Sequence, residues 1–163
     1  MDGVATAEHG QYVLFRLAVE EYGIPIRRVQ SIIRYEAPTP VPRAPEGVDG
    51  VINLRGQVIP LIDLGKVLLG AALVPTPASR IIVVETSFGA IGLAVDFVLE
   101  VASIVADDIR PAPSAALDSE MLEAFEGVAN HGDRLIILLD AEKALPKPVF
   151  ASMGVGQEDG ADV

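Results

Sequence analysis

A gapless internal repeat constrains the fold of this chain more than any other feature of its sequence. Residues 50–68, "GVINLRGQVIPLIDLGKVL", align with residues 127–145, "GVANHGDRLIILLDAEKAL", with eight identities in nineteen positions. A weaker alignment places 12–33 over 81–102, where the apolar pattern is largely kept. Self-similarity at a fixed spacing is the signature of a repeated structural unit. The sequence therefore predicts two similar units, the second with a longer middle section near residues 105–125.

Each unit is predicted to be a small β-barrel. "YVLFRLA" and "RIIVVET" are rich in β-branched and aromatic residues, which favour strands. "VIPLID" and "RLIILLD" are nearly continuous apolar runs, typical of strands buried on both faces. Fifteen glycines and twelve prolines favour short strands joined by turns. Because short strands lose their exposed edges by closing into a barrel, we expect two barrels side by side, with a crevice suited to recognition between them.

Positions kept in both copies are predicted to serve the fold, and positions that differ are candidates for function. Asp63 and Asp140 each follow an apolar strand and precede a helical stretch, where an aspartate caps the first helical turn. Arg55 lies at a hairpin tip where the second copy has a glycine–aspartate pair. The turn needs a residue such as Gly56 that tolerates positive φ, but it does not need an arginine. Arg55 is either a solvated turn charge or a recognition residue, since arginine is enriched among binding hot spots.

Charge and composition exclude several classes of protein. The net charge of −11 argues against nucleic acid as a partner, because phosphate binding needs a clustered basic surface. The chain has no cysteine, so it has neither disulfides nor thiolate metal sites. The first ten residues lack the basic and apolar regions of a signal peptide, and the longest apolar stretches contain charges. We therefore expect a soluble protein, with flexible tails at 1–10 and 150–163.

No catalytic, metal-binding or cofactor-binding motif is evident in the sequence. The two histidines are His9, in the N-terminal tail, and His131, in the turn-like "NHGD". No glycine-rich phosphate loop follows a strand, and no cluster has metal-ligand spacing. Asp107 and Asp108 are adjacent and are expected to be solvated. These observations predict a non-enzymatic protein without cofactor or metal; an enzyme or a small-molecule-binding double barrel stays the alternative, because folding brings together carboxylates that are distant in sequence.

The segment "YEAPTPVPRAPEGVDG", at 35–50, contains too many prolines to form a helix. It is predicted to run extended across a surface, either as a stiff connection between barrel elements or as part of a recognition surface.

Beyond these patterns, the chain resembles the CheW family of bacterial chemotaxis coupling proteins over residues 11–146. The resemblance is carried by several blocks that follow one another in the family's order: "YVLFRLAVEEYGIPIRRVQSIIRY", "TPVPRAPEGVDGVINLRGQVIPLIDL", "RIIVVE", "AIGLAVDFVLEV", "ADDIRPAP" and "GDRLIILLDAEKAL". It implies a mostly β fold of two pseudo-duplicated five-stranded SH3-like barrels, with short helices and an apolar groove between them. The first barrel is expected to span roughly 20–75 and the second roughly 80–138, with the terminal strands free to exchange between them.

The resemblance also implies a function. Members of this family are non-enzymatic adaptors that join the cytoplasmic, coiled-coil tips of methyl-accepting chemoreceptors to the regulatory domain of the CheA histidine kinase. The chain would then be cytoplasmic and would reach the membrane only through receptor arrays. Two alternatives stay open: a CheW-like paralogue that serves another receptor–kinase pathway, such as twitching or gliding motility, and the regulatory end of a kinase.

Site residues follow from the same resemblance, position by position. The implied receptor-binding residues are Val29, Gly50, Asn53, Leu54, Arg55 and Gly56. The implied kinase-binding residues are Ser31, Ile32 and Arg110. Many family members carry an acidic residue in place of Ser31, so Ile32 is expected to supply the main contact there. Ala115 replaces a larger apolar side chain found in some relatives, which predicts a weak second contact.

Overall fold

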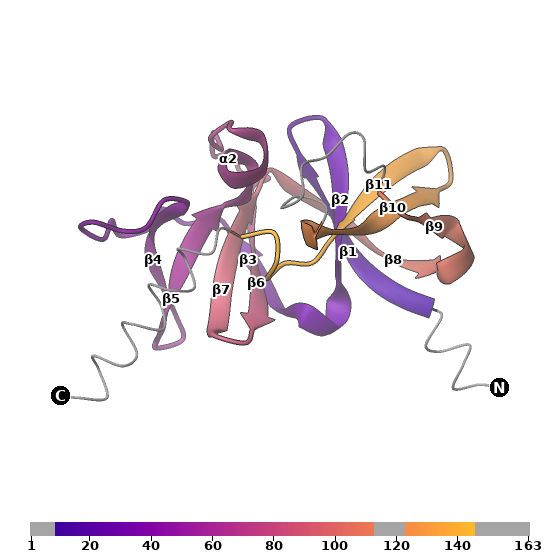
Figure 1. The fold of residues 1–163 in the computed structure, drawn as a ribbon. Helices are drawn as coiled ribbons and strands as arrows, with labels where there is room; N and C mark the ends of the chain where they lie inside the picture. The colour runs from indigo at the N-terminus through magenta and orange to yellow at the C-terminus, as the bar shows by residue number, and fades with distance from the viewer. Residues whose placement is uncertain (1–8, 113–122, 146–163) are drawn as a thin grey trace.

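The computed structural model describes residues 9–112 and 123–145, which form eleven strands and three short helices (Figure 1). The first repeat supplies β1 (His9–Leu17), β2 (Glu20–Pro25), the 3-10 helix η1 (Ile26–Arg28), β3 (Val29–Arg34), β4 (Val48–Leu54), β5 (Gln57–Asp63) and α2 (Leu64–Leu69). The second supplies β6 (Arg80–Thr86), β7 (Gly89–Val95), β8 (Phe97–Val105), the 3-10 helix η2 (Ala106–Asp108), β9 (Ile109–Arg110), β10 (Phe125–His131) and β11 (Arg134–Leu139). The predicted mostly β architecture is confirmed.

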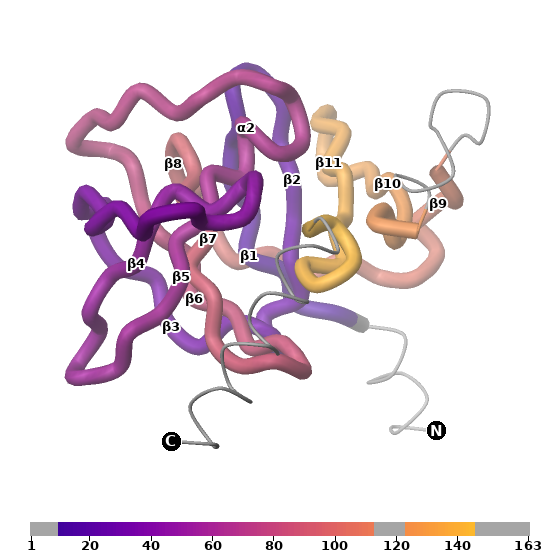
Figure 2. The backbone as a smooth tube through the Cα atoms, turned by 60° about the vertical axis from the view of Figure 1, so that its left-hand side comes forward, coloured from indigo at the N-terminus to yellow at the C-terminus, as the bar shows by residue number. Residues whose placement is uncertain are grey.

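The strands form two sheets, and each sheet contains a hairpin from the other repeat. The five-stranded sheet has the order β3-β6-β7-β5-β4, and the six-stranded sheet has the order β8-β1-β2-β11-β10-β9. Hairpin β6–β7 therefore sits among first-repeat strands, and hairpin β1–β2 sits among second-repeat strands. Parallel pairs β5–β7 and β11–β2 hold these hairpins in place. Figures 1 and 2 show the two sheets side by side, with α2 next to the turn between β1 and β2.

The register of the two sheets confirms the duplication in detail. Strand β4 has a bulge between Val48 and Gly50, and β10 has one at the equivalent place, between Phe125 and Gly127. At Gly50 a Cβ atom would lie 2.3 Å from the carbonyl oxygen of Thr39, and at Gly127 one would lie 2.8 Å from that of Arg110. Both glycines also have a positive φ near 155° that L side chains rarely adopt (153° and 159°). Glycine is therefore required at both bulges, because a side chain there would collide with the neighbouring segment that contains Thr39 or Arg110.

Three apolar cores stabilise this arrangement. One core lies within the five-stranded sheet and includes Ile52, Leu61 and Val83, and another lies within the six-stranded sheet around Leu14 and Leu138. The third and largest core lies between the sheets, and the side chains of its central residues are buried: Val13, Phe15, Ile24, Ile62, Leu64, Ile82, Val84, Ile91, Leu93, Val95 and Leu139. Alternate residues of one strand enter different cores, which explains the nearly continuous apolar runs. The apolar groove predicted between the barrels lies at this interface, where the core side chains are buried.

The two aspartates kept in both copies accept backbone hydrogen bonds, as predicted. Asp63 caps α2 by accepting from the Lys66 amide at 3.1 Å, and it also accepts from the Leu73 amide at 2.7 Å. Asp140 accepts from the amides of Glu142 and Lys143, both at 3.0 Å.

The helix predicted after Asp140 is wrong, because residues 141–144 form turns. One amide, that of Ala144, reaches back to the Asp140 carbonyl at 2.9 Å. Pro146 follows in the sequence, and a proline disfavours helical geometry in the residue before it. The corresponding stretch of the first repeat has no such proline and forms α2.

The proline-rich connection after β3 runs without helix, as predicted. Thr39 pairs with Val51 of β4 through amide–carbonyl bonds of 2.8 and 2.9 Å. Arg110 of β9 pairs with Val128 of β10 at the equivalent place in the other sheet. Within residues 9–112 and 123–145, no helix has the length and apolarity needed to cross a membrane.

Candidate functional site

The tip that joins β4 to β5 places Arg55 in an unusual backbone conformation. Leu54 pairs with Gln57, so Arg55 and Gly56 are the two central residues of a tight turn. Their φ angles are +53° and +86°, and two positive values in succession define the turn family that matches the twist of a hairpin. Within the described part of the chain, the exposed Arg55 side chain makes no hydrogen bond or ion pair. Its guanidinium donors are therefore free to meet another molecule.

Neighbouring residues hold this tip rigidly. Ile52 belongs to the core of the five-stranded sheet, and Leu54 packs against that core. Asn53 points to the other face, where its side-chain oxygen accepts a hydrogen bond from the Gly56 amide at 2.9 Å. Gly50 lies at the far end of β4, buried beneath the connection from β3, as described above.

The residues predicted on β3 lie on an edge strand of the five-stranded sheet. Val29 begins the strand and packs against the core between the sheets. Ile32 exposes 39% of its surface, which is a large fraction for an isoleucine. The Ser31 hydroxyl is buried and has no hydrogen-bond partner among the described residues. A buried hydroxyl without a partner is costly in a folded protein, so this edge strand carries an unsatisfied polar group beside an exposed apolar one.

Arg110 lies far from β3 in the fold. It is an exposed residue of β9, the last strand of the six-stranded sheet. The structure thus places Ser31 and Ile32 together on one sheet and Arg110 on an edge of the other. Ala115 lies outside the described residues.

The inward-facing residues at one end of the five-stranded barrel form a surface that we call the first-barrel end. Some of them belong to or pack against the core inside that sheet, and the others lie two residues along a strand from a residue that does. Because side chains alternate along a strand, all of them face the same side as that core. The residues of the first-barrel end are Ser31, Leu54, Gln57, Glu85 and Ala90.

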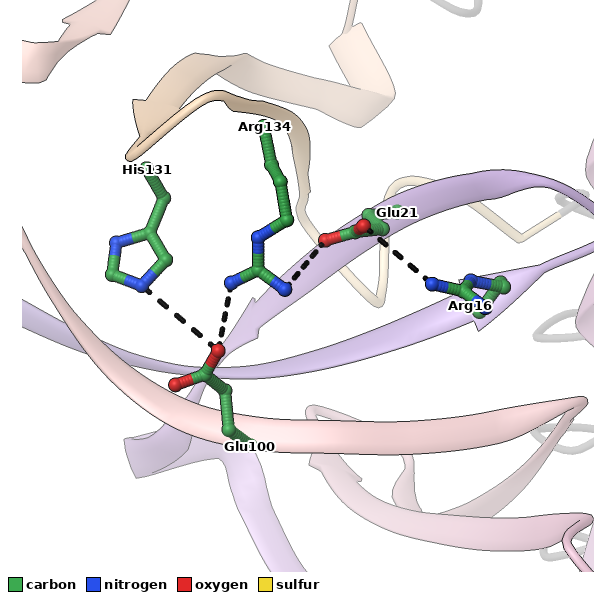
Figure 3. A network of polar contacts seen from close by, with 5 residues as sticks. All are labelled: Arg16, Glu21, Glu100, His131 and Arg134. Carbon is green, nitrogen blue, oxygen red and sulfur yellow. Dashed lines mark hydrogen bonds and ion pairs between the residues drawn. The ribbon is translucent and has the colours of Figure 1, made fainter.

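The equivalent positions in the six-stranded sheet hold four charged residues and a histidine. We call them the second-barrel end: Glu100, His131, Arg134, Arg16 and Glu21. Figure 3 shows that these side chains converge on one another. The sequence-based prediction missed this cluster. The alignment of the repeats did contain the signal, since neutral or unlike residues occupy the same positions in the other copy.

Ion pairs connect the whole second-barrel end. Arg134 contacts Glu100 at 2.7 Å and Glu21 at 3.3 Å (Figure 3). Glu21 also lies 3.7 Å from Arg16, whose guanidinium stacks on Phe97 at 5.3 Å from the ring centre. The Glu21 side chain is only 13% exposed, so its two cationic neighbours compensate a partly buried charge. The bond between Arg134 and Glu100 links β11 to β8, which are not neighbours in the sheet order, and so closes the barrel.

A second polar cluster lies beside η1, at the junction of the sheets. A small pocket there is lined by Pro25, Arg27, Arg28, Glu85, Glu126, Asp140, Ala141 and Glu142. Burial, followed by the nearby Asp140 charge, raises the pKa of the Glu126 carboxyl. The carboxylate of Glu142 accepts from the Ser87 hydroxyl at 2.5 Å and from the Ser87 amide at 2.8 Å, and these bonds lower the pKa of Glu142. This contact ties the turn between β6 and β7 to the six-stranded sheet.

Among the described residues, no group of three or more histidine, aspartate and glutamate side chains is arranged to hold a metal ion. Arg55 thus presents a free guanidinium at the β4–β5 tip, and Ile32 presents exposed apolar surface on edge strand β3.

Comparison with known proteins agrees with this geometry. The family model of the CheW-like domain matches residues 11–148. The chain is 38% identical over 141 residues to the chemotaxis protein CheW of Klebsiella aerogenes, covering 86% of this chain and 84% of that protein. It is 32% identical over 135 residues to CheW of Bacillus subtilis, covering 83% and 86%. The crystal structure of the scaffolding protein TtCheW from Thermoanaerobacter tengcongensis superposes with a TM-score of 0.76 at 35% identity, covering 86% of this chain and 90% of that one.

A β protein built of two packed barrels is the class of protein that the fold defines. This chain belongs to the CheW-like domain family.

Proposed function

We propose that this chain is a non-enzymatic adaptor that couples the cytoplasmic tips of chemoreceptors to a CheA-type histidine kinase. Family membership makes it a chemotaxis adaptor. The observation that carries the finer proposal is the free guanidinium of Arg55, which a strained turn presents to solvent and which the duplicate copy lacks. We place the chain at membrane-associated receptor arrays, which it reaches through its partners.

The receptor is proposed to bind at the β4–β5 tip. Arginine offers five donors in a planar fork that matches carboxylate and carbonyl groups. The tip is anchored by Leu54 in the barrel core and by the bond from Asn53 to the turn. A rigid donor loses little conformational freedom on binding, so an arginine presented this way contributes orientation at low entropic cost.

The kinase is proposed to bind at two separate faces. One face is β3, where Ile32 supplies exposed apolar surface. The other is β9, where Arg110 lies on the edge of the opposite sheet. Two faces on opposite barrels allow one adaptor to contact two kinase domains, so that adaptors and kinases can alternate in a larger assembly.

An adaptor of this kind acts by holding its partners close together. Linking kinase to receptor converts a bimolecular encounter into one at a high effective concentration. A small movement of the receptor tip can then bias the kinase between two states without any group transfer by the adaptor. Single contacts of this type are small, on the order of 1,200 Å² in total or less, and the assembly gains strength from their number.

A second candidate function has one specific observation in its favour. The chain is 32% identical over 103 residues to protein FrzA of Myxococcus xanthus, covering 63% of this chain and 64% of that protein. A CheW-like paralogue in another receptor–kinase pathway, such as surface motility, would have the same fold and the same faces. The receptor and kinase that copurify with the chain distinguish the two functions.

The proposal is tested by reconstituting the pathway from purified parts. Kinase autophosphorylation is measured with the receptor's cytoplasmic fragment, with and without this chain, and with the Arg55→Ala variant. We expect receptor control of phosphorylation only when the wild-type chain is present, and reduced control with the variant. Receptor control that is equally strong without the chain would refute the adaptor role.

A further inference from the structure

The β4–β5 turn holds an arginine where its own duplicate uses glycine. Aligning the repeats places Arg55 opposite Gly132, and both residues have a positive φ, +53° and +64°; the turns differ at the next residue, because Gly56 has a positive φ of +86° and Asp133 does not. Glycine adopts that conformation freely, whereas a residue with a Cβ atom is strained there. A side chain of this size persists in such a conformation only when the surrounding structure enforces it.

Asn53 is the side chain that enforces the conformation. Its oxygen accepts from the Gly56 amide at 2.9 Å, a bond that spans Arg55 and closes the turn from the outside. Asparagine side chains commonly close turns in this way. The duplicate copy again supplies the comparison: Asn130 occupies the same place, and its side chain makes no hydrogen bond within the described residues. With glycine at 132, that turn needs no such support.

We propose that Asn53 is a positioning residue that fixes the direction of the Arg55 guanidinium, and that it acts on the partner only through Arg55. The inference rests on the proposed function, because it assumes that Arg55 contacts the receptor. It assigns to Asn53 a role other than direct contact: the side-chain oxygen is the acceptor that closes the turn, while the side-chain NH2 group has no partner among the described residues. Leu54, which lies between them, supports the same geometry from the inner face by packing on the barrel core.

The test is a double-mutant cycle on the full chain, with the receptor's cytoplasmic fragment as the ligand in a binding titration. We expect Asn53→Ala to weaken binding about tenfold, because a mobile tip must lose conformational freedom on binding. Asn53→Asp keeps the acceptor oxygen and should restore most of the affinity. Asn130→Ala, the matched control from the second repeat, should bind like the wild type. In an Arg55→Ala background, Asn53→Ala should have no further effect, since a residue that acts through Arg55 has nothing left to position.

The outcomes separate this inference from the proposed function. If Arg55→Ala weakens binding and Asn53→Ala does not, Asn53 has no positioning role. If Asn53→Ala weakens binding further after Arg55 has been removed, Asn53 contacts the partner itself and the inference is wrong. If Arg55→Ala binds normally, the proposed receptor contact fails. Thermal denaturation of each variant distinguishes lost affinity from unfolding, and we expect midpoints within about 4 °C of the wild type.

Discussion

The two barrel ends occupy equivalent positions in the repeats and have opposite chemistry. At the second-barrel end, four charged side chains and His131 contact one another, and Arg134 alone joins two carboxylates from different strands. At the first-barrel end, Ser31 stands in place of Glu100 and Gln57 in place of Arg134, so no equivalent ion pair exists there. Glu85 is the charged residue of this end, and the Arg55 guanidinium at the adjoining tip has no partner in the described part of the protein.

This difference shows how a duplicated fold can divide its tasks. One end uses its charges internally, and these pairs close the six-stranded barrel. The other end keeps its cation free; the buried Ser31 hydroxyl lacks a hydrogen bond there, as Arg16 Nε and Glu21 Oε1 do at the second-barrel end. We propose that the first barrel, with its free cation, carries recognition, and that the ion pairs of the second-barrel end contribute to stability.

Removing the free cation should have the largest effect on binding. We expect Arg55→Ala to lower affinity for the receptor fragment about 30-fold, which corresponds to about 2 kcal/mol, as is typical of a central hot-spot arginine. The free energy of unfolding should change little, because the side chain makes no internal contact. A titration and a urea denaturation of the same sample provide both values. A loss of stability with unchanged affinity would reverse the roles assigned to the two ends.

Breaking the paired charges should lower the free energy of unfolding and leave receptor affinity nearly unchanged. Arg134→Gln leaves the partly buried Glu21 with only the more distant Arg16, and we expect a loss of about 1–2 kcal/mol in the free energy of unfolding. Receptor affinity should stay within about twofold of the wild type. Gln57→Ala is the matched control, since Gln57 occupies the equivalent position without an ion pair. Equal destabilisation by both variants would show that the network contributes nothing.

Giving the first turn the glycine of its duplicate should relieve strain. We expect Arg55→Gly to be more stable than Arg55→Ala by about 1 kcal/mol, because glycine adopts the left-handed conformation without steric cost. Both variants should lose the receptor contact to the same degree. Chemical denaturation of the two variants measures the difference. If Arg55→Gly were the less stable of the two, the turn would not be strained at this residue.

The smallest expected effect is on the pH dependence of stability, and it concerns two carboxylates at equivalent bulges. Burial, with Asp63 next in size, raises the pKa of Asp49, and burial, with Asp140 next, raises the pKa of Glu126. A raised carboxyl pKa means that the native state binds the proton more tightly than the unfolded chain. Each group therefore reduces stability as the pH rises above its ordinary pKa, 3.8 for Asp49 and 4.5 for Glu126.

Asp49→Asn and Glu126→Gln should thus gain stability relative to the wild type as the pH rises from about 4 to about 7. Urea denaturation across that range measures the trend. We expect a smaller gain for Glu126→Gln than its burial suggests, because that variant also loses the attraction of Arg27 and Arg28. If the variants instead gained stability relative to the wild type as the pH fell, the assigned pKa directions would be contradicted.

Much of the fold could be predicted from the sequence because the repeat preserves it. The alignment of 50–68 with 127–145 reproduces strands β4 and β10 residue for residue, and both capping aspartates follow from their position after a buried strand. Residues 141–144 form turns instead of the predicted helix, because Pro146 disfavours helical geometry in the residue before it. The family resemblance left the terminal strands free to exchange between the barrels, but which hairpins exchange depends on contacts between distant strands, which local patterns do not encode.

The candidate site was less predictable, for a different physical reason. The sequence singled out Arg55 through its absence from the second copy, but its left-handed φ depends on the bond from Asn53 and on the packing of Leu54. The unsatisfied Ser31 hydroxyl depends on burial at a strand edge, which only the fold determines. Likewise, the residues of the second-barrel end come from five strands and become one network only in three dimensions (Figure 3).

Hydrogen–deuterium exchange on the wild-type chain, with and without the receptor's cytoplasmic fragment, tests the division of tasks most directly. It compares the β4–β5 tip with the β10–β11 tip in one sample, and no substitution is needed. We expect the complex to slow amide exchange across residues 53–57 and to leave exchange across residues 130–134 unchanged. Slower exchange at the β10–β11 tip alone, or equal slowing at both tips, would contradict the assignment of recognition to the first barrel.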